Sequence, residues 1–431
     1  MNRLIGVVIA LVCLMFLAWF SADATGSTAR IVRSMVAVAA LALFATVVPL
    51  RLLIWIIPLG PVLDASLLWT GSEIYLTEMI VLSVATVWAM GIIRGKVALP
   101  GLSLPAMLMI LFGALGVLAT IIGHPEQMTT TAGLRSTRVL WIGGLVVWIW
   151  NSLDGNHHRR LVSWTRASLL ALALLALGGI VEFLTGDRTG EPGSFYNSSI
   201  GLSVHMAFMM PLALAVVLGS GLRKARILGG VGYLAGLAVL VLTASRGALG
   251  SVALTTMALL AFSARRLEGP RRTIVLAAVA LVVIGGITLG LKPELAGEAF
   301  AYKFERSLAG DFFSTRTAEW QEAMSAIKAS PFFGEGAEAW SPSMPLELAR
   351  QHGIPAALAA FGAIFAAIWF AARSRSGSDN PNACVTPATT TLGLAFGLTG
   401  LVLVGLAETG LGARLTPLLA ACIASSTRTV E

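Results

Sequence analysis

Charge is what this 431-residue sequence has least of. Only 12% of its residues are charged, whereas a soluble globular domain has about 25%. At the same time 56% of the residues are hydrophobic, and the mean hydropathy is +0.83. So few charged side chains cannot cover a surface that faces water, so the composition excludes a soluble domain. We therefore expect an integral membrane protein.

Cysteine is scarce too, and its pattern excludes the usual metal sites. Cys13 and Cys422 lie in apolar runs, and with Cys384 they show no metal-ligand spacing. The five histidines are scattered, so we expect no zinc site and no cofactor. The net charge of +8 does not indicate a nucleic-acid partner, because excess arginine and lysine in a membrane protein mark its cytoplasmic loops.

Long apolar runs dominate the chain. A membrane-spanning helix needs about 20 mostly apolar residues. The candidate runs are 4–21, 34–58, 72–92, 102–122, 137–151, 161–184, 203–220, 226–243, 247–263, 273–291, 350–372, 388–406 and 411–425. No clear cleavage site follows the first run, so we expect a spanning helix there. Arg51 interrupts the second run, which is either one helix or two short ones, 34–50 and 52–68. We expect an all-α bundle of about 12–14 transmembrane helices.

Basic clusters fall on alternate loops, which sets the orientation. These clusters are Arg94/Lys96, Arg159/Arg160, Arg223/Lys224/Arg226, Arg265/Arg266/Arg271/Arg272 and Arg373/Arg375. The positive-inside rule places them in the cytoplasm. The loops 123–136, 185–202, 244–247, 292–349 and 407–411 then face outward. The chain divides into N-terminal helices (1–184), further helices with a tight turn (185–291), a long external loop (292–349) and C-terminal helices (350–431).

The external loop contains one long polar segment, 313–336. Residues recur there at helical spacing and predict an amphipathic helix with one apolar face against the bundle or the membrane surface. These residues are Arg316, Trp320, Ala323, Met324 and Ile327. The following "SPFFGEG", with Pro331, Gly334 and Gly336, predicts the end of that helix.

The positive-inside rule explains arginines in cytoplasmic loops, but it does not explain the arginines in segments predicted to face outward. They are Arg135, Arg138, Arg246, Arg306 and Arg316. Arg246 lies between two apolar helices, beside Gly247, which allows a close backbone approach. An ionisable group at that depth indicates a functional partner; the alternative is that it reaches out to lipid headgroups. Guanidinium groups bind phosphate oxygens in pairs, so a lipid diphosphate at the outer surface would fit several of them.

Three segments in order resemble the family of bacterial O-antigen ligases and O-antigen polymerases. They are "GEPGSFYNSSIGLSVHMAFMMPLAL", "LVLTASRGALGSVAL" and "STRTAEWQEAMSAIKASPFFGEG". The resemblance runs from about residue 185 to 365, while the first half of the chain is similar only in hydropathy and loop pattern. It implies a glycosyltransferase of the inner membrane. The donor would be a glycan on an undecaprenyl-diphosphate carrier, transferred on the periplasmic face to lipid A core or to another lipid-linked repeat.

The resemblance also implies roles for particular residues. Arg246 and Arg316 match the arginines that handle the diphosphate, and Ser245 and Gly247 complete the Ser-Arg-Gly turn. Arg135 or Arg138 would correspond to a further basic residue before a helix, and Arg306 adds an external cation. The lipid diphosphate is itself the leaving group, so neither metal nor nucleotide is implied.

The chain differs from the family at the positions that would act on the acceptor sugar. Ligases carry a histidine in a His-Asn-x-x-Leu pattern, followed by Glu-x-Gly. Here Ser341 or Pro342 stands at the histidine position and Gln351 at the glutamate position. His352 lies nearby, displaced by about three helical turns. It is either a replacement base or acceptor ligand, or a histidine with a local structural bond at a helix start.

Glu319 and Glu347 are further candidates for the base, or else solvated charges. The missing histidine favours a polymerase over a ligase. Two other functions stay open at this stage, a secondary transporter and a non-catalytic assembly scaffold. Against the transporter, the sequence has no matching halves, and its ionisable residues gather at one membrane face.

Overall fold

The computed structural model describes the chain in separate stretches. These are residues 53–64, 76–95, 101–129, 131–152, 157–185, 199–219, 223–243, 245–264, 311–336, 343–373 and 387–407, with residues 97, 339, 341 and 419. Within them the chain forms helices and turns, and no strand occurs. The all-α prediction is confirmed. The predicted helices 4–21, 34–50 and 273–291 lie outside these stretches, as does 411–425 apart from Leu419, so the total of about 12–14 stays a prediction.

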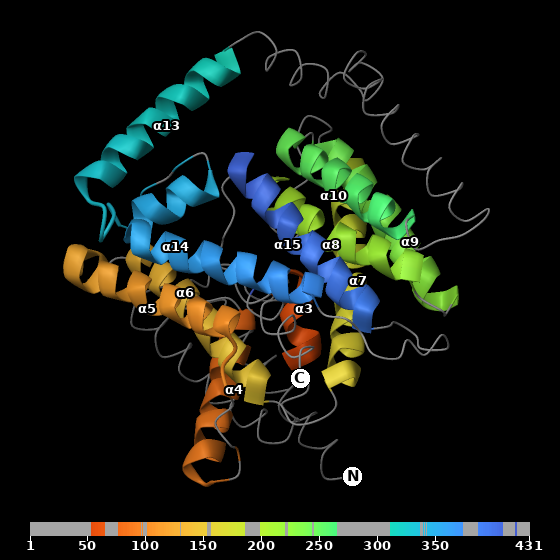
Figure 1. Cartoon of the computed structure of the whole chain (residues 1–431), viewed down its shortest axis with the longest axis horizontal. Helices are drawn as coiled ribbons and strands as arrows, with labels where there is room; N and C mark the ends of the chain where they lie inside the picture. Colours follow the sequence, from red (N-terminus) through yellow and green to blue (C-terminus); the bar gives the residue numbers. More distant parts are fainter. Residues whose placement is uncertain are drawn as a thin grey trace.

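The helices fill most of the described chain (Figure 1). In chain order they are α3 (Leu53–Asp64), α4 (Leu76–Ile93), α5 (Leu104–Gly123), the short 3-10 helix η3 (Pro125–Thr129), α6 (Thr131–Ser152), α7 (His157–Thr185), α8 (Ser199–Gly219), α9 (Arg223–Thr243), α10 (Arg246–Ala264), α13 (Asp311–Ala329), α14 (Met344–Arg373) and α15 (Pro387–Ala407). α3 extends to Asp64, past the end of the single predicted run 34–58, and residues 34–52 lie outside the described stretches, so the choice between one helix and two stays open.

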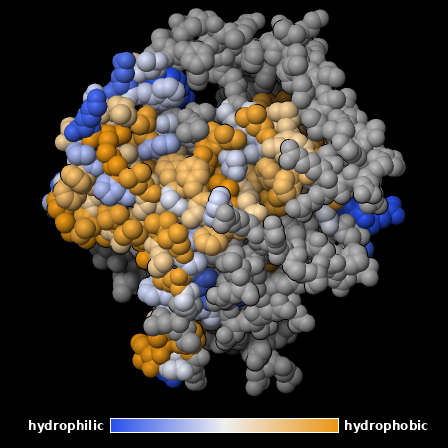
Figure 2. Space-filling model, in the orientation of Figure 1, coloured by the Kyte–Doolittle hydropathy of each residue, from blue (hydrophilic) through white to orange (hydrophobic). Residues whose placement is uncertain are grey.

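Five described segments are long and apolar enough to cross a bilayer. They are Leu104–Gly123, Arg160–Thr185, Gly201–Gly219, Arg223–Thr243 and Met344–Ala372. A spanning helix needs about 20 apolar residues, and each segment meets that length or comes within one residue of it. The protein is therefore a polytopic membrane helix bundle. Hydrophobic residues cover the face over α5 and α14, whereas hydrophilic residues gather over α13 at the upper left of the view (Figure 2).

α5 shows how one helix meets both lipid and protein. Leu104, Met107, Leu111, Leu118 and Ile122 are exposed and recur at helical spacing. The opposite side is buried against α14 and α6. Pro105 sits in the first turn, where its missing N–H leaves no hydrogen bond unmade.

α8 is the most buried of the five candidate spans, and α15 packs against it in the opposite direction. Near the start of α15, Gly393 faces Leu212 of α8. Further along α15, Gly400 lies against the carbonyl of Ala207. Glycine is required at such crossings, because a Cβ at Gly400 would stand 2.7 Å from that oxygen. The end of α15 therefore lies where α8 begins.

α9 also runs opposite to α8. Gly229, in the second turn of α9, lies against Val217 of α8. Gly236 lies against Met206 and Met210, nearer the start of α8. The end of α9, and with it the start of α10, therefore lies at the same end of the bundle as the start of α8.

This end of the bundle also receives α13, α14 and α5, and we call it the α13 end. Gly405 of α15 lies against Met344, the first residue of α14. His124, directly after α5, bonds to Gly334 in the turn after α13. At the α13 end therefore lie the end of α5, the start of α6, the start of α10, the start of α14 and the end of α15.

Three helices differ from their predicted extents. α6 begins at Thr131, so Arg135 and Arg138 lie within its first turns and not before it. α7 begins at His157, so the basic cluster at Arg159 and Arg160 belongs to the helix and not to a loop. Arg160 is buried and donates to the carbonyl of Trp150 at 3.2 Å. The hydrogen bond to the end of α6 supplies one partner for this buried arginine.

The third difference is at α14, which begins at Met344 and not near residue 350. Its backbone is non-helical at Gly353, with φ of 84°. A short polar helix therefore precedes the apolar span, and a hydropathy pattern detects only the span.

Candidate functional site

The turn after α13 folds back onto the start of α14. The amide of Ile354 donates to the carbonyl of Pro331 at 2.8 Å, and the amide of Glu335 donates to the carbonyl of Arg350 at 2.6 Å. Gly334 and Gly336 have φ of 69° and 97°, a region that side chains disfavour. The prediction that "SPFFGEG" ends the helix is confirmed, and α13 stops at Ala329.

Gly353 of α14 lies against the backbone of this turn. Its φ is 84°, and a Cβ there would collide with the backbone carbonyl of Phe332. The bend in α14 and the turn after α13 therefore fit together only because both carry glycines.

α13 packs on α14 through small and aliphatic side chains. Ala323, Ala326 and Ile327 are buried. Trp320 and Met324, predicted to share the packed face, are instead 43% and 45% exposed. The apolar face exists, but its smaller residues meet the protein and its larger ones face outward.

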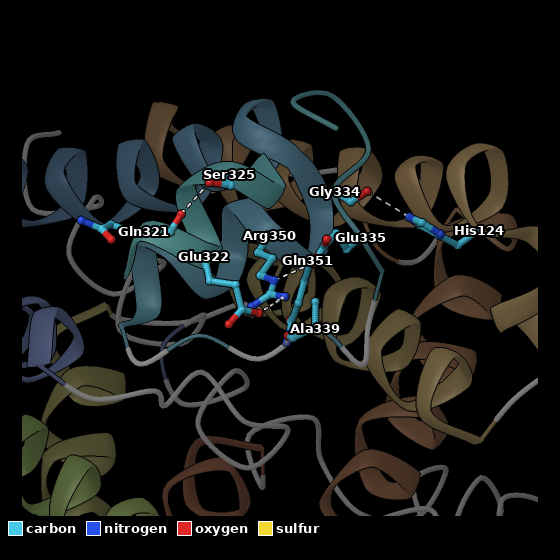
Figure 3. A network of polar contacts seen from close by, with 9 residues as sticks. All are labelled: His124, Gln321, Glu322, Ser325, Gly334, Glu335, Ala339, Arg350 and Gln351. Carbon is cyan, nitrogen blue, oxygen red and sulfur yellow. Dashed lines mark hydrogen bonds and ion pairs between the residues drawn. The ribbon is translucent and has the colours of Figure 1, made fainter. Parts of the chain in front are cut away.

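Arg350 connects α13 with the turn (Figure 3). Its Nη2 donates to Glu322 of α13 at 3.0 Å, and its Nε donates to Glu335 of the turn at 2.5 Å. The side chain of Arg350 is only 17% exposed. One arginine of α14 thus holds two segments that precede it. Arg350 could not be identified as a structural residue from the sequence, because nothing in the local pattern marks its two glutamate partners.

The end of α5 is tied to the same turn. The ring nitrogen Nε2 of His124 lies 3.1 Å from the carbonyl oxygen of Gly334 and donates to it as the Nε2–H tautomer (Figure 3). Nδ1 of His124 lies 3.5 Å from Glu126. Gln127 of η3 sits where a Cβ at Gly336 would stand. η3 leads directly into α6, so the turn after α13 is anchored beside the start of α6.

Arg316 lies in the second turn of α13. Its side chain is 26% exposed and forms an ion pair with Glu319 at 3.7 Å, one turn along the same helix. The ion pair joins two residues with different predicted roles: Arg316 as a phosphate ligand and Glu319 as a candidate base.

The Ser-Arg-Gly turn is the beginning of α10. Ser245 precedes the helix, and its hydroxyl accepts a hydrogen bond from the amide of Ala248 at 3.4 Å. Serine is a favoured residue at this capping position. Arg246 is the first residue of α10, and Gly247 follows it. Only the backbone of Arg246 is described.

The predicted arginines lie on three separate segments whose described ends fall towards the α13 end, although α13 itself packs on α14. Arg246 begins α10, and Arg135 and Arg138 lie in the first turns of α6. Arg316 lies on α13, which packs over the start of α14 (Figure 1). Of Arg135 and Arg138, too, only the backbone is described, and Arg306 lies outside the described residues.

His352 is buried beside the bend of α14. It is 3% exposed, and its ring meets Phe112 of α5 edge-on, with centroids 6.4 Å apart. It lies one residue before Gly353, where the short polar helix ends and the apolar span begins. This burial favours a structural role over contact with an acceptor.

Gln351, at the position expected for glutamate, holds the segment before α14. Its Nε2 donates to the carbonyl of Ala339 at 2.8 Å and lies 3.5 Å from Glu347. Ser341, at one of the positions expected for histidine, is fully buried. In the described part of the chain, no group of three His, Cys, Asp or Glu residues could hold a metal ion.

Comparison with known proteins gives one family. The family model described as O-antigen ligase matches residues 231–357. The matched segment begins in α9 and contains Arg246, Arg316, the turn after α13 and His352. No curated protein matches the chain. The resemblance read from the sequence is thereby confirmed for residues 231–357, which match the O-antigen ligase family model, whereas the segment 190–214 lies outside the matched residues.

Proposed function

We propose that the chain is a membrane glycosyltransferase of the O-antigen polymerase and ligase type. It would transfer a glycan from an undecaprenyl-diphosphate carrier to an acceptor sugar on the periplasmic face of the inner membrane. The observation that carries the proposal is the arrangement of two motif segments. The start of α10 with Arg246 lies at the α13 end of the bundle, and α13, which carries Arg316, packs on the start of α14 at the same end.

The electrostatics of this end suit a diphosphate. The N-terminus of a helix carries partial positive charge and attracts anions. Arg246 adds a full positive charge at that place on α10, where it opposes the helix dipole unless an anion is bound. The start of α6, with Arg135 and Arg138, contributes a second helix N-terminus of the same kind.

The arginines would act on the leaving group. When the glycosidic bond to the carrier breaks, negative charge develops on the departing diphosphate. Fixed donors aimed at that charge lower the barrier, and removal of one such donor typically costs about 10²–10³ in rate. Because arginine stays protonated, it serves both as substrate ligand and as stabiliser of this charge.

Arg316 and Glu319 suggest how the site changes on binding. In the structure their ion pair is partly exposed and 3.7 Å long, and such pairs contribute little stability, about 0–1 kcal/mol. A diphosphate would therefore displace Glu319 from Arg316 at small cost. Glu319, released from the pair, is the carboxylate nearest the phosphate ligand and would accept the proton of the acceptor hydroxyl.

A polymerase is favoured over a ligase. The residues at the ligase histidine and glutamate positions are packed or bonded within the protein, since Ser341 is buried and Gln351 holds Ala339. A ligase to lipid A core is the alternative within the family. A transporter or an assembly scaffold would be favoured only if no glycan transfer occurs.

The test is a transfer assay in vitro. The purified protein is incubated with a lipid-diphosphate oligosaccharide, with and without core lipid, and the products are separated by size on a gel. A ladder of products identifies a polymerase, and one-step transfer to core lipid identifies a ligase. Unchanged donor under both conditions contradicts the proposed function.

A further inference from the structure

A groove on the membrane-facing side of the bundle runs between α5 and α6. It has a volume of about 510 Å³, within the ~300–1,000 Å³ typical of pockets for small ligands. α5 contributes Ile110, Val117 and Ile121 to its lining, and α6 contributes Gly144, Leu145 and Trp148. All the described lining residues are apolar or glycine, so the groove offers no site for a polar head.

Small residues keep the groove open. Gly144 of α6 lies against Ile110 of α5, where a Cβ would stand 3.6 Å from the isoleucine side chain. Ala114 of α5 is exposed on the lining and occupies little space. A larger side chain at either place would fill the groove from its wall.

The groove is open along its length towards the bilayer. Leu118 and Ile121 on its rim are 48% and 49% exposed and belong to the stripe of α5 that faces away from the bundle. A flexible hydrocarbon chain can therefore enter sideways from the membrane.

The groove leads to the α13 end. From Ile110 to Ile121 it follows α5 for about 16 Å, at ~1.5 Å per residue. Ile121 lies one turn before His124, which bonds to the turn after α13. On the facing helix the groove leads to the start of α6, because η3 joins the two helices as an antiparallel pair. A chain in the groove would thus end beside the helix start that carries Arg135 and Arg138.

We propose that this groove binds the polyprenyl chain of the lipid diphosphate. The inference rests on the proposed function for the identity of the ligand and deepens it by locating the hydrocarbon part. An apolar groove that leads to a helix N-terminus carrying two arginines matches an amphiphile with a long hydrocarbon tail and a charged diphosphate head. An ordinary acyl chain of the bilayer would fill the groove without preference for that head.

The first measurement is binding, which does not depend on catalysis. Native mass spectrometry in detergent counts undecaprenyl diphosphate and phosphatidylglycerol retained by the full chain and by Ala114→Leu and Gly144→Leu. We expect both variants to lose about tenfold in retention of undecaprenyl diphosphate with little change for phosphatidylglycerol. Leu111→Phe, which adds bulk to the exposed side of α5 outside the groove lining, should bind as the unaltered chain does. Equal loss of both lipids, or loss of neither, overturns the inference.

The second measurement separates the groove from the chemistry. Transfer rates are compared for donors whose prenyl chain is long or short. We expect the unaltered chain to prefer the long donor by about tenfold, Ala114→Leu to lose that preference, and Arg246→Ala to lose transfer from both donors. If Ala114→Leu keeps the preference for the long donor, the inference that the groove binds the prenyl chain is wrong. Absence of transfer by the unaltered chain overturns the proposed function, and the binding measurement then still decides on the groove.

Discussion

Arg350 on α14 donates to Glu322 on α13 at 3.0 Å, across 28 residues of sequence. Its second partner, Glu335, lies in the turn that joins the two helices. One guanidinium group therefore connects α13 and the turn after it to the start of α14. The position of α13, and with it that of Arg316, depends on this contact.

Replacement of Arg350 should loosen α13. Exposed ion pairs contribute about 0.2–1 kcal/mol each, and Arg350 makes two while it is only 17% exposed. Arg350→Ala should therefore lower the free energy of unfolding by ~1–2 kcal/mol and speed proteolysis within 311–336. Limited proteolysis followed by mass spectrometry measures this. Arg223→Ala, an exposed arginine at the start of α9, is the control, and equal cleavage in both variants contradicts the account.

The bend at Gly353 should tolerate no side chain. Its φ of 84° disfavours any other residue, and a Cβ would meet the carbonyl of Phe332. Strained backbone of this kind costs ~1–3 kcal/mol, and the collision adds to it. Gly353→Ala should thus lower the melting temperature clearly, measured by thermal unfolding in detergent. Gly362→Ala on the same helix meets only Leu108 at 3.4 Å and should melt within a few degrees of the unaltered chain; the reverse order would show that the bend is not needed.

His352 should affect stability more than transfer. It is 3% exposed and packs against Phe112, so it is shielded from an acceptor in this conformation. His352→Gln keeps a neutral polar side chain and should retain transfer within about threefold, whereas loss of a general base costs about 10²–10⁴. His352→Ala should lower stability by ~2–3 kcal/mol through the cavity that it leaves. A hundredfold loss of transfer in His352→Gln, with unchanged melting, would assign the histidine to the chemistry instead.

The sequence predicted the spanning helices well, because each is an apolar run with charged or glycine residues at its ends. α10, expected at 247–263 and found at Arg246–Ala264, is one case. The segment Met344–Gln351 could not be seen in this way. Its polar residues Arg350 and Gln351 bond to segments that precede them in the chain, and local sequence carries no sign of those partners.

The packed face of α13 shows a second limit. Spacing predicted an amphipathic helix there, and the helix is present. It placed Ala323 on the apolar face, but it did not predict that Ala326 would be buried with it while Trp320 and Met324 stay exposed. In a membrane protein, large apolar residues are about as stable against lipid as against protein, and small residues allow helices to approach closely. Hydrophobicity alone therefore does not identify the packed side.

The central claim is that Arg246 and Arg316, from separate segments, act together on one diphosphate. The most direct measurement is the initial rate of glycan transfer from a lipid-diphosphate donor by Arg246→Ala, Arg316→Ala and the control Arg223→Ala, at equal amounts of folded protein. We expect a loss of about 10²–10³ for each of the first two, a loss in the double variant well short of the product of the two, and an unchanged rate for the control. Full activity in Arg246→Ala or Arg316→Ala, or the same modest loss in all three variants, would contradict the account.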